Sequence, residues 1–227
     1  MRLVFEKFES SLVLRRDAIN VLRIEDASLY SRCALSLAQG FPDDALEPAY
    51  FFDEEGREAK ASKVLFYAGD VLSLDLNDKR ITTQMLKTVV ERMATEGDSV
   101  QALEKINYQI EDIIEEQFLQ MSADYRFADV WDASKYLKML GLCIDDSEDI
   151  TVYDKVRHYM RAMSDLFPDK VIALVNLPLY LTGEQYGAIC ELIASLQLCV
   201  LSYERRGVVA LRDFENVLFI DADYLER

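Results

Sequence analysis

The chain has 227 residues, of which 51% are hydrophobic, and its formal charge is -16. This composition excludes an intrinsically disordered protein, and the length allows one domain or two. The negative charge argues against unaided binding to an anionic membrane or to nucleic acid, although it does not exclude a local basic surface.

The first seventy residues are predicted to be rich in strands, because short apolar runs there alternate with turn residues. Asp26 is expected to cap a helix from about residue 28 to residue 38, which Gly40 ends. The residues Asp53-Glu54-Glu55-Gly56 form a good hairpin turn. Strands are expected at residues 2–5, 11–14, 18–24, 48–52, 58–60 and 64–67.

The middle of the chain is predicted to be helical. Apolar residues recur at helical spacing from about residue 78 to residue 94, and Gly97-Asp98 breaks the pattern. The two long helices on either side of the break are interpreted as an antiparallel hairpin. Two further helices are expected at about 127–140 and 153–166. The second long helix has a heptad-like apolar seam at Leu103, Ile106, Ile110 and Ile113.

The last sixty residues return to α/β alternation. Residues 171–175 form a nearly continuous apolar run, which is typical of a strand buried on both faces. Thr182 is expected to cap a helix over residues 183–196, and strands are expected at 198–203 and 217–220. Strand, helix and strand in this order imply a parallel crossover. We therefore predict an α/β head built from residues 1–72 and 168–227, with an inserted helical leg at residues 73–167.

An acidic stretch from Glu111 to Asp132 is the most informative feature for function, and it is expected to be largely helical. Apolar residues are interleaved with its carboxylates, which indicates a packed scaffold rather than a solvated tail. Carboxylates held close together repel one another, and a hard cation such as calcium relieves that repulsion. The alternative is a solvated face, which is the commoner case for acid-rich helices in general.

The inventory of chemical groups argues against an enzyme. His158 is the single histidine, so a zinc site would lack a second histidine ligand. A serine-protease triad would have to use His158, and no GxSxG motif supplies the nucleophile. No GxxxxGK[ST] loop follows the strands at 64–67 or 171–175, and no GxGxxG occurs. Basic groups are scattered and by themselves usually solvate a surface. Lys135 and Lys138 share a helix face, but such groups line a DNA path only if an oligomer gathers them.

Cysteine usage and the N-terminal residues indicate a cytoplasmic protein. Cys33, Cys190 and Cys199 lie in apolar periodic segments, and no CxxC pair is present, so reduced core cysteines are expected. Residues 1–7 carry charges where a signal peptide needs an apolar run. No apolar stretch reaches membrane-spanning length, so no membrane association is expected.

Several short segments in a fixed order resemble the Csn2 family, which are CRISPR-associated proteins of type II-A systems that take part in spacer acquisition. The resemblance covers essentially the whole chain, and none of the segments is a catalytic motif. The segments are residues 1–6, 21–26, 28–31, 74–77, 136–141, 171–176, 181–182 and 221–224.

The resemblance implies a degenerate P-loop-NTPase-like α/β head with an extended α-helical leg. It also implies a homotetrameric ring with a positively charged hole, stabilised by calcium on acidic residues. Members bind double-stranded DNA at its ends without sequence preference and slide along it, and no nuclease or nucleotidase activity is expected. The implied partners are the CRISPR adaptation integrase and the type II effector nuclease.

The acidic stretch falls in the leg, where the calcium-linked carboxylates of the family lie. The candidate metal ligands are Glu115, Glu116, Asp124, Asp129 and Asp132. The candidate DNA-binding residues are Arg126, Lys135 and Lys138, chosen because they neighbour the acidic stretch. The alternative function is an acidic protein-interaction scaffold of the adaptation complex with little DNA binding of its own. A nucleotide-dependent switch would need the phosphate loop that the sequence lacks.

Overall fold

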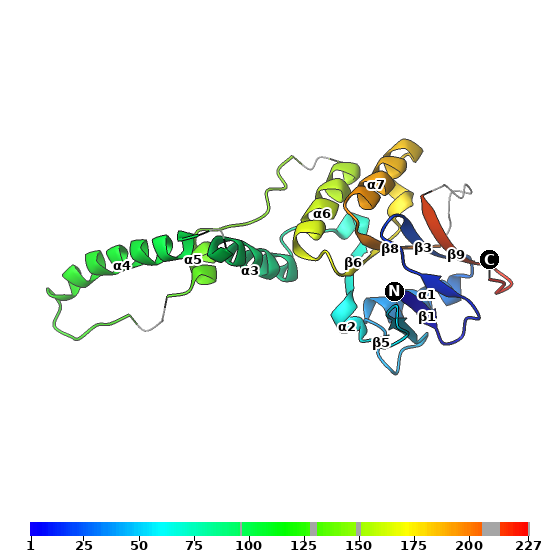
Figure 1. Cartoon of the computed structure of the whole chain (residues 1–227), viewed down its shortest axis with the longest axis horizontal. Coiled ribbons are helices and arrows are strands. Elements are labelled where there is room, and N and C mark those ends of the chain that lie inside the picture. The colour runs from blue at the N-terminus through cyan, green and yellow to red at the C-terminus, as the bar shows by residue number, and fades with distance from the viewer. Residues whose placement is uncertain (96, 128–130, 149–150, 206–213, 227) are drawn as a thin grey trace. The chain divides into compact units, whose positions relative to one another are not determined.

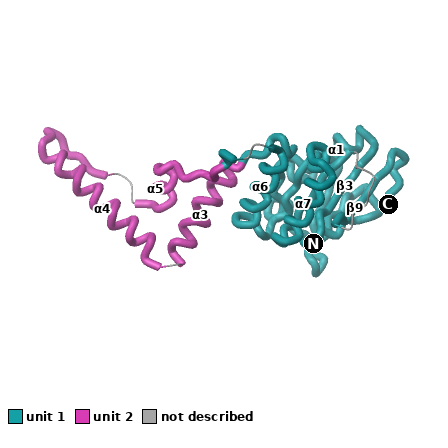
Figure 2. The backbone as a smooth tube through the Cα atoms, turned by 90° about the horizontal axis from the view of Figure 1, so that it is seen from above, with its two compact units in different colours: residues 1–75, 146–227 teal, residues 76–145 magenta. Residues whose placement is uncertain are grey.

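The computed structural model describes residues 1–95, 97–127, 131–148, 151–205 and 214–226. The chain divides into two compact units (Figure 2). Unit 1 comprises residues 1–75 and 146–227, and unit 2 comprises residues 76–145. The α/β class with an inserted helical unit, which the sequence predicts, is confirmed.

Unit 1 is built on a five-stranded sheet with the order β6-β7-β8-β3-β9, in which every pair of neighbours is parallel. The chain enters this sheet at β3, and the strand order reverses between β3 and β8, as in doubly wound α/β domains. The strands are β3 (Ile19–Ile24), β6 (Leu65–Asp70), β7 (Val171–Val175), β8 (Cys199–Glu204) and β9 (Glu215–Ile220) (Figure 1).

The parallel sheet is covered on both faces, which explains its apolar strands. All five residues of β7 are buried. Val171, Ala173 and Tyr203 belong to one buried cluster with helix α1 (Ala27–Ala38) and with the N-terminal strands. Alternate residues of a strand point to opposite faces, so Ile172 faces the other side of the sheet. Helices α6 (Val152–Leu166) and α7 (Gly183–Ser195) pack on each other in unit 1, and α7 contacts β3.

A second, antiparallel sheet has the order β2-β1-β4-β5. The strands predicted at residues 2–5, 11–14, 48–52 and 58–60 are therefore confirmed in place. The predicted hairpin turn is also present, since the Asp53 N–H donates to Arg57 O at 2.9 Å and Gly56 has φ +78°. The strands are β1 (Arg2–Phe5), β2 (Ser11–Val13), β4 (Ala49–Phe52) and β5 (Glu58–Ala59), with the short helices α2 (Ala61–Val64) and η1 (Val71–Ser73) after them.

Unit 2 contains α3 (Lys79–Thr95), α4 (Ser99–Phe118) and α5 (Ala133–Met139). The predicted antiparallel hairpin is not a closely packed pair, because α3 and α4 diverge along their lengths (Figure 2). The third helix, expected at 127–140, is shorter than predicted and begins after Asp132, whose side chain caps it.

Helix α6 lies in unit 1, whereas the sequence interpretation placed residues 153–166 in the leg. The physical reason is its apolar face: Val156, Tyr159, Met160 and Met163 are all buried. The capping box of Thr151 and Asp154 fixes where the helix begins. The boundaries of the inserted unit are therefore 76–145 rather than 73–167.

Cys33, Cys190 and Cys199 are buried, as the sequence predicts, and Cys143 is exposed. Burial raises the pKa of Cys33 to about 12 and that of Cys199 to about 11, so these two thiols are poor nucleophiles. None of the helices in the described ranges combines the length and apolar character needed to cross a membrane.

Candidate metal and nucleic-acid interface

The acidic candidates lie at the end of α4, in the segment that follows it, and at the start of α5. Glu115 and Glu116 are exposed in the last turns of α4, which ends at Phe118. Asp124 is exposed in the segment after the helix, and that segment is not helical, contrary to the sequence prediction. Asp132 caps α5, and Asp129 lies outside the described residues.

Aromatic side chains explain why the chain leaves the helix here. The ring of Phe118 lies 5.5 Å from that of Tyr125 and 5.8 Å from that of Phe127, measured between centroids. These contacts fold residues 119–127 back against the end of α4. The aromatic residues of this segment, whose spacing predicted a helix, therefore form a local cluster with Phe118 instead.

Carboxylate oxygens are the donors that calcium prefers, so the donor chemistry of these residues fits the ion. The number of these carboxylates that one chain brings together in the described ranges is too small for a calcium site. Among the residues that the structure describes, no three His, Cys, Asp or Glu side chains gather closely enough to hold a metal. One oxygen of Asp132 is already engaged, since Oδ1 accepts a hydrogen bond from Lys135 N at 2.8 Å.

The basic candidates of the leg are exposed. Lys135 and Lys138 lie three residues apart in α5 and therefore share one face of it. Lys138 sits in the last turn, where a cation also complements the helix dipole. Arg126 is exposed in the segment after α4. The structure thus brings two of the three candidates onto one helix face.

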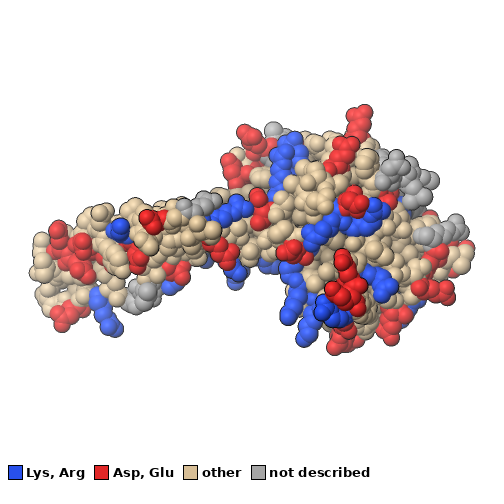
Figure 3. All heavy atoms as spheres, viewed as in Figure 1, with Lys and Arg blue, Asp and Glu red and all other residues tan. Residues whose placement is uncertain are grey.

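Unit 1 offers a second basic helix face, which the sequence analysis took for ordinary solvated charge. Arg157 and Arg161 are exposed and one turn apart on α6. Arg157 lies 3.9 Å from Asp154 and over the ring of Tyr153, so its charge is only partly neutralised. Figure 3 shows Lys and Arg interspersed with Asp and Glu on the face of unit 1 in view.

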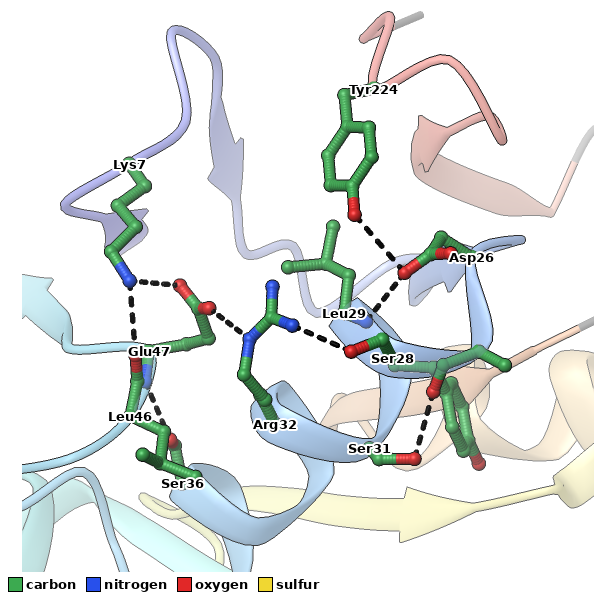
Figure 4. A network of polar contacts seen from close by, with 12 residues as sticks. Lys7, Asp26, Ser28, Leu29, Ser31, Arg32, Ser36, Leu46, Glu47 and Tyr224 are labelled. Atoms are coloured by element: carbon green, nitrogen blue, oxygen red, sulfur yellow. Dashed lines mark hydrogen bonds and ion pairs between the residues drawn. The ribbon is translucent and has the colours of Figure 1, made fainter.

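The start of α1 is where a phosphate loop would lie, because α1 follows β3, the first strand of the parallel sheet. Residues 25–28 read Glu-Asp-Ala-Ser and contain no glycine. The Asp26 carboxylate accepts hydrogen bonds from Leu29 N at 2.7 Å and from the Tyr224 hydroxyl at 3.2 Å (Figure 4). The Leu29 N–H bond is the main cause of the lowered pKa of Asp26. A negative charge thus occupies the position that a phosphate would need.

The heptad-like apolar seam of α4 is exposed in the structure. Ile106, Ile110 and Ile113 are 44%, 40% and 65% exposed. None of the residues of α4 is buried. Leu119 and Met121 extend the exposed apolar surface beyond the helix. Exposed apolar residues that share one helix face can form a protein interaction site.

Comparison with known proteins places this architecture in context. The family model described as "CRISPR-associated protein (Cas_Csn2)" matches residues 43–224. A CRISPR-associated protein Csn2 of Streptococcus agalactiae is 26% identical over 99% of this chain and 96% of its own. One from Enterococcus faecalis is 23% identical over 92% of this chain and 91% of its own. The crystal structure of Stu0660 of Streptococcus thermophilus has a TM-score of 0.63 at 16% identity, covering 97% of this chain and 74% of its own.

Proposed function

The chain belongs to the Csn2 family of CRISPR-associated proteins, and from this premise we propose that it binds double-stranded DNA non-enzymatically during spacer acquisition. In this proposal the working form is a calcium-stabilised homotetrameric ring that holds DNA ends without regard to sequence. The observation that carries the proposal is the family match over residues 43–224. The adaptation integrase and the effector nuclease of the system are its proposed protein partners.

The exposed seam of α4 supports self-association. Burying Ile106, Ile110 and Ile113 against another chain removes apolar area from water, which stabilises an interface by about 25 cal/mol per Å² of apolar surface. A second copy of this chain offers the same seam, so a symmetric contact satisfies both. Unit 2 of one subunit is proposed to pair with unit 2 of its neighbour through this seam.

Calcium fits the acidic end of the same unit. Each chain carries a formal charge of -16, so four chains repel one another unless cations intervene. Glu115, Glu116, Asp124 and Asp132 supply oxygen donors, and two chains together can reach the six to eight ligands that calcium takes. Bound calcium would supply positive charge at this end of unit 2. The protein's own part is to hold the carboxylates on α4 and at the start of α5.

DNA binding is proposed to run through phosphates. Lys135 and Lys138 on α5, and Arg157 and Arg161 on α6, are exposed cations that a ring would repeat four times. Contacts of this kind are sensitive to salt and indifferent to sequence. A closed ring admits linear DNA only at an end, so recognition of ends follows from topology.

We propose no nucleotide chemistry, because a carboxylate lies at the start of α1. A phosphate at that helix would face the carboxylate of Asp26, which already accepts the Leu29 N–H. We therefore propose neither an ATPase nor a nucleotide switch. The acidic composition also supports a second candidate, a scaffold that contacts a basic protein and binds little DNA.

The test compares linear and covalently closed circular duplex of equal length, with calcium and with chelator. Calcium-dependent binding of linear DNA alone is the expected result. Equal binding of both forms would overturn the closed ring but keep a DNA-binding protein. If neither form binds, the scaffold is the better account.

A further inference from the structure

The turn between β1 and β2 holds a carboxylate through its backbone. Glu9 N donates to Glu226 Oε1 at 2.8 Å, and Ser10 N donates to Glu226 Oε2 at 2.5 Å. The two amides are consecutive in the chain, and each meets a different oxygen of the carboxylate. Successive backbone N–H groups in a turn form a concave site for anions. The turn therefore has the geometry of an anion site, and a side chain distant in sequence fills it.

The segment that carries Glu226 follows β9 and reverses direction. Asp221 Oδ1 accepts hydrogen bonds from Asp223 N at 3.0 Å and from Leu225 N at 2.9 Å. Asp221 N in turn donates to Leu225 O at 3.1 Å. These bonds close a turn that brings Glu226 back beside Ile220, with which it forms an antiparallel bridge. The Asp221 side chain thus fixes the path that leads Glu226 to the β1–β2 turn.

Two further contacts hold the same segment to the start of α1. The Tyr224 hydroxyl donates to Asp26 Oδ1 at 3.2 Å (Figure 4), and Ala222 N donates to Glu25 Oε2 at 3.3 Å. Tyr224 has φ +63°, a left-handed conformation that residues other than glycine keep only where their surroundings hold it. The segment is therefore fastened to the parallel sheet at β3 and α1, and to the antiparallel sheet through Glu226.

We propose that the β1–β2 turn is a carboxylate-binding site that the chain fills with its own Glu226, and that this contact makes residues 221–226 a clip between the two sheets of unit 1. The ligand class follows from the group that occupies the site. One carboxylate satisfies both N–H groups, so a carboxylate from another molecule binds there only where Glu226 has left. Opening of the clip and binding of a second carboxylate are therefore coupled.

The test measures hydrogen exchange of the wild type and Glu226→Ala in sodium acetate and in sodium chloride of equal ionic strength. Glu54→Ala, at an exposed residue of the turn between β4 and β5, is the control for loss of charge. In chloride, we expect the amides of Glu9 and Ser10 to exchange roughly 3- to 10-fold faster in Glu226→Ala, the factor that one net hydrogen bond provides. The control should match the wild type.

Acetate supplies the missing carboxylate, so it should slow the exchange of Glu9 and Ser10 in Glu226→Ala and leave the wild type unchanged. The Leu225 amide should exchange faster in this variant too, because its bond to Asp221 belongs to the clip. Unchanged exchange of Glu9 and Ser10 in the variant would overturn the clip, as would faster exchange throughout β7. If acetate has no more effect than chloride on the variant, the turn is not a carboxylate-binding site.

Discussion

Asn77 and Ile144 exchange two hydrogen bonds although 67 residues separate them. Asn77 Nδ2 donates to Ile144 O at 3.2 Å, and Ile144 N donates to Asn77 Oδ1 at 3.1 Å. The side-chain amide of Asn77 thus pairs with the backbone of Ile144 as a neighbouring strand would. This contact joins the two ends of unit 2, which spans residues 76–145. The two points where the chain enters and leaves this unit are held together by one residue.

Asn77→Ala should therefore destabilise unit 2 by about 1–3 kcal/mol, because it leaves both backbone groups of Ile144 without this partner. Hydrogen exchange is the measurement, and the Ile144 amide should lose protection while β7 amides keep theirs. Gln109→Ala on the exposed side of α4 serves as the control. Unchanged protection of Ile144 would show that other contacts close the unit.

Glu47 is a buried carboxylate held by two cations (Figure 4). Its side chain is 3% exposed and lies 3.1 Å from Lys7 Nζ and 2.6 Å from Arg32 Nε. Arg32→Ala leaves this carboxylate with Lys7 alone, and we expect a loss of about 2–4 kcal/mol in urea unfolding. Lys87→Ala, which breaks an exposed pair with Glu91, should cost under about 1 kcal/mol. Equal losses in the two variants would contradict this account of Glu47.

Ile113→Asp should shift the protein toward smaller species in sedimentation velocity while leaving its circular dichroism unchanged. Ile113 is 65% exposed, so the substitution costs the monomer little. In a paired seam it buries a carboxylate in an apolar contact. Leu46→Asp, at a similarly exposed apolar residue in unit 1, should leave the sedimentation pattern as it is.

Asp132→Asn separates the role of this residue as a cap from its proposed role as a calcium ligand. Asparagine caps helices about as well as aspartate, so the stability of α5 should hold. We expect the calcium dependence of assembly to weaken in sedimentation, more so when Glu115→Gln is added. Glu91→Gln on α3 is the control for charge alone. Retention of full calcium dependence in the double variant would remove these residues from the ligand set.

Lys135→Ala with Lys138→Ala tests the DNA face of α5. For every phosphate that a subunit no longer neutralises, the slope of log binding constant against log salt should become shallower by about 0.9. Arg157→Ala with Arg161→Ala makes the same measurement on α6. A reduced slope only in the α6 pair would move the DNA face to unit 1.

The fold could be predicted where burial sets the pattern. Residues 171–175 are apolar because both faces of β7 are covered, and 153–166 show helical spacing because one face of α6 is buried. The spacing of Ile106, Ile110 and Ile113 correctly indicated a helix, but spacing alone does not say what covers the seam. The helical prediction for Phe127 is wrong because its ring packs on Phe118, across a turn that apolar spacing does not show.

The candidate site was less predictable, because charge and spacing do not show which hydrogen bonds and ring contacts a side chain makes. Asp132 stands out in the sequence for its charge, yet its observed hydrogen bond is to the N–H of Lys135, which fixes where α5 begins. Arg23 of β3 forms ion pairs with Glu204 of β8 and Glu215 of β9, in strands that the sequence indicates only as short apolar runs. Parallel pairing of β8, β3 and β9 brings these three residues together. Local spacing in the sequence does not show which strands pair.

The inserted unit lies between β6 and β7, which are direct neighbours in the parallel sheet. The sheet therefore constrains only where the connection leaves Asp70 and where it returns at Val171, while the free-energy cost of a longer connection grows slowly with length. This makes the connection a natural grafting point. A chain in which unit 2 is exchanged for another helical unit whose two ends lie close together should still form the parallel sheet. Evolution can therefore change the inserted unit without changing the sheet.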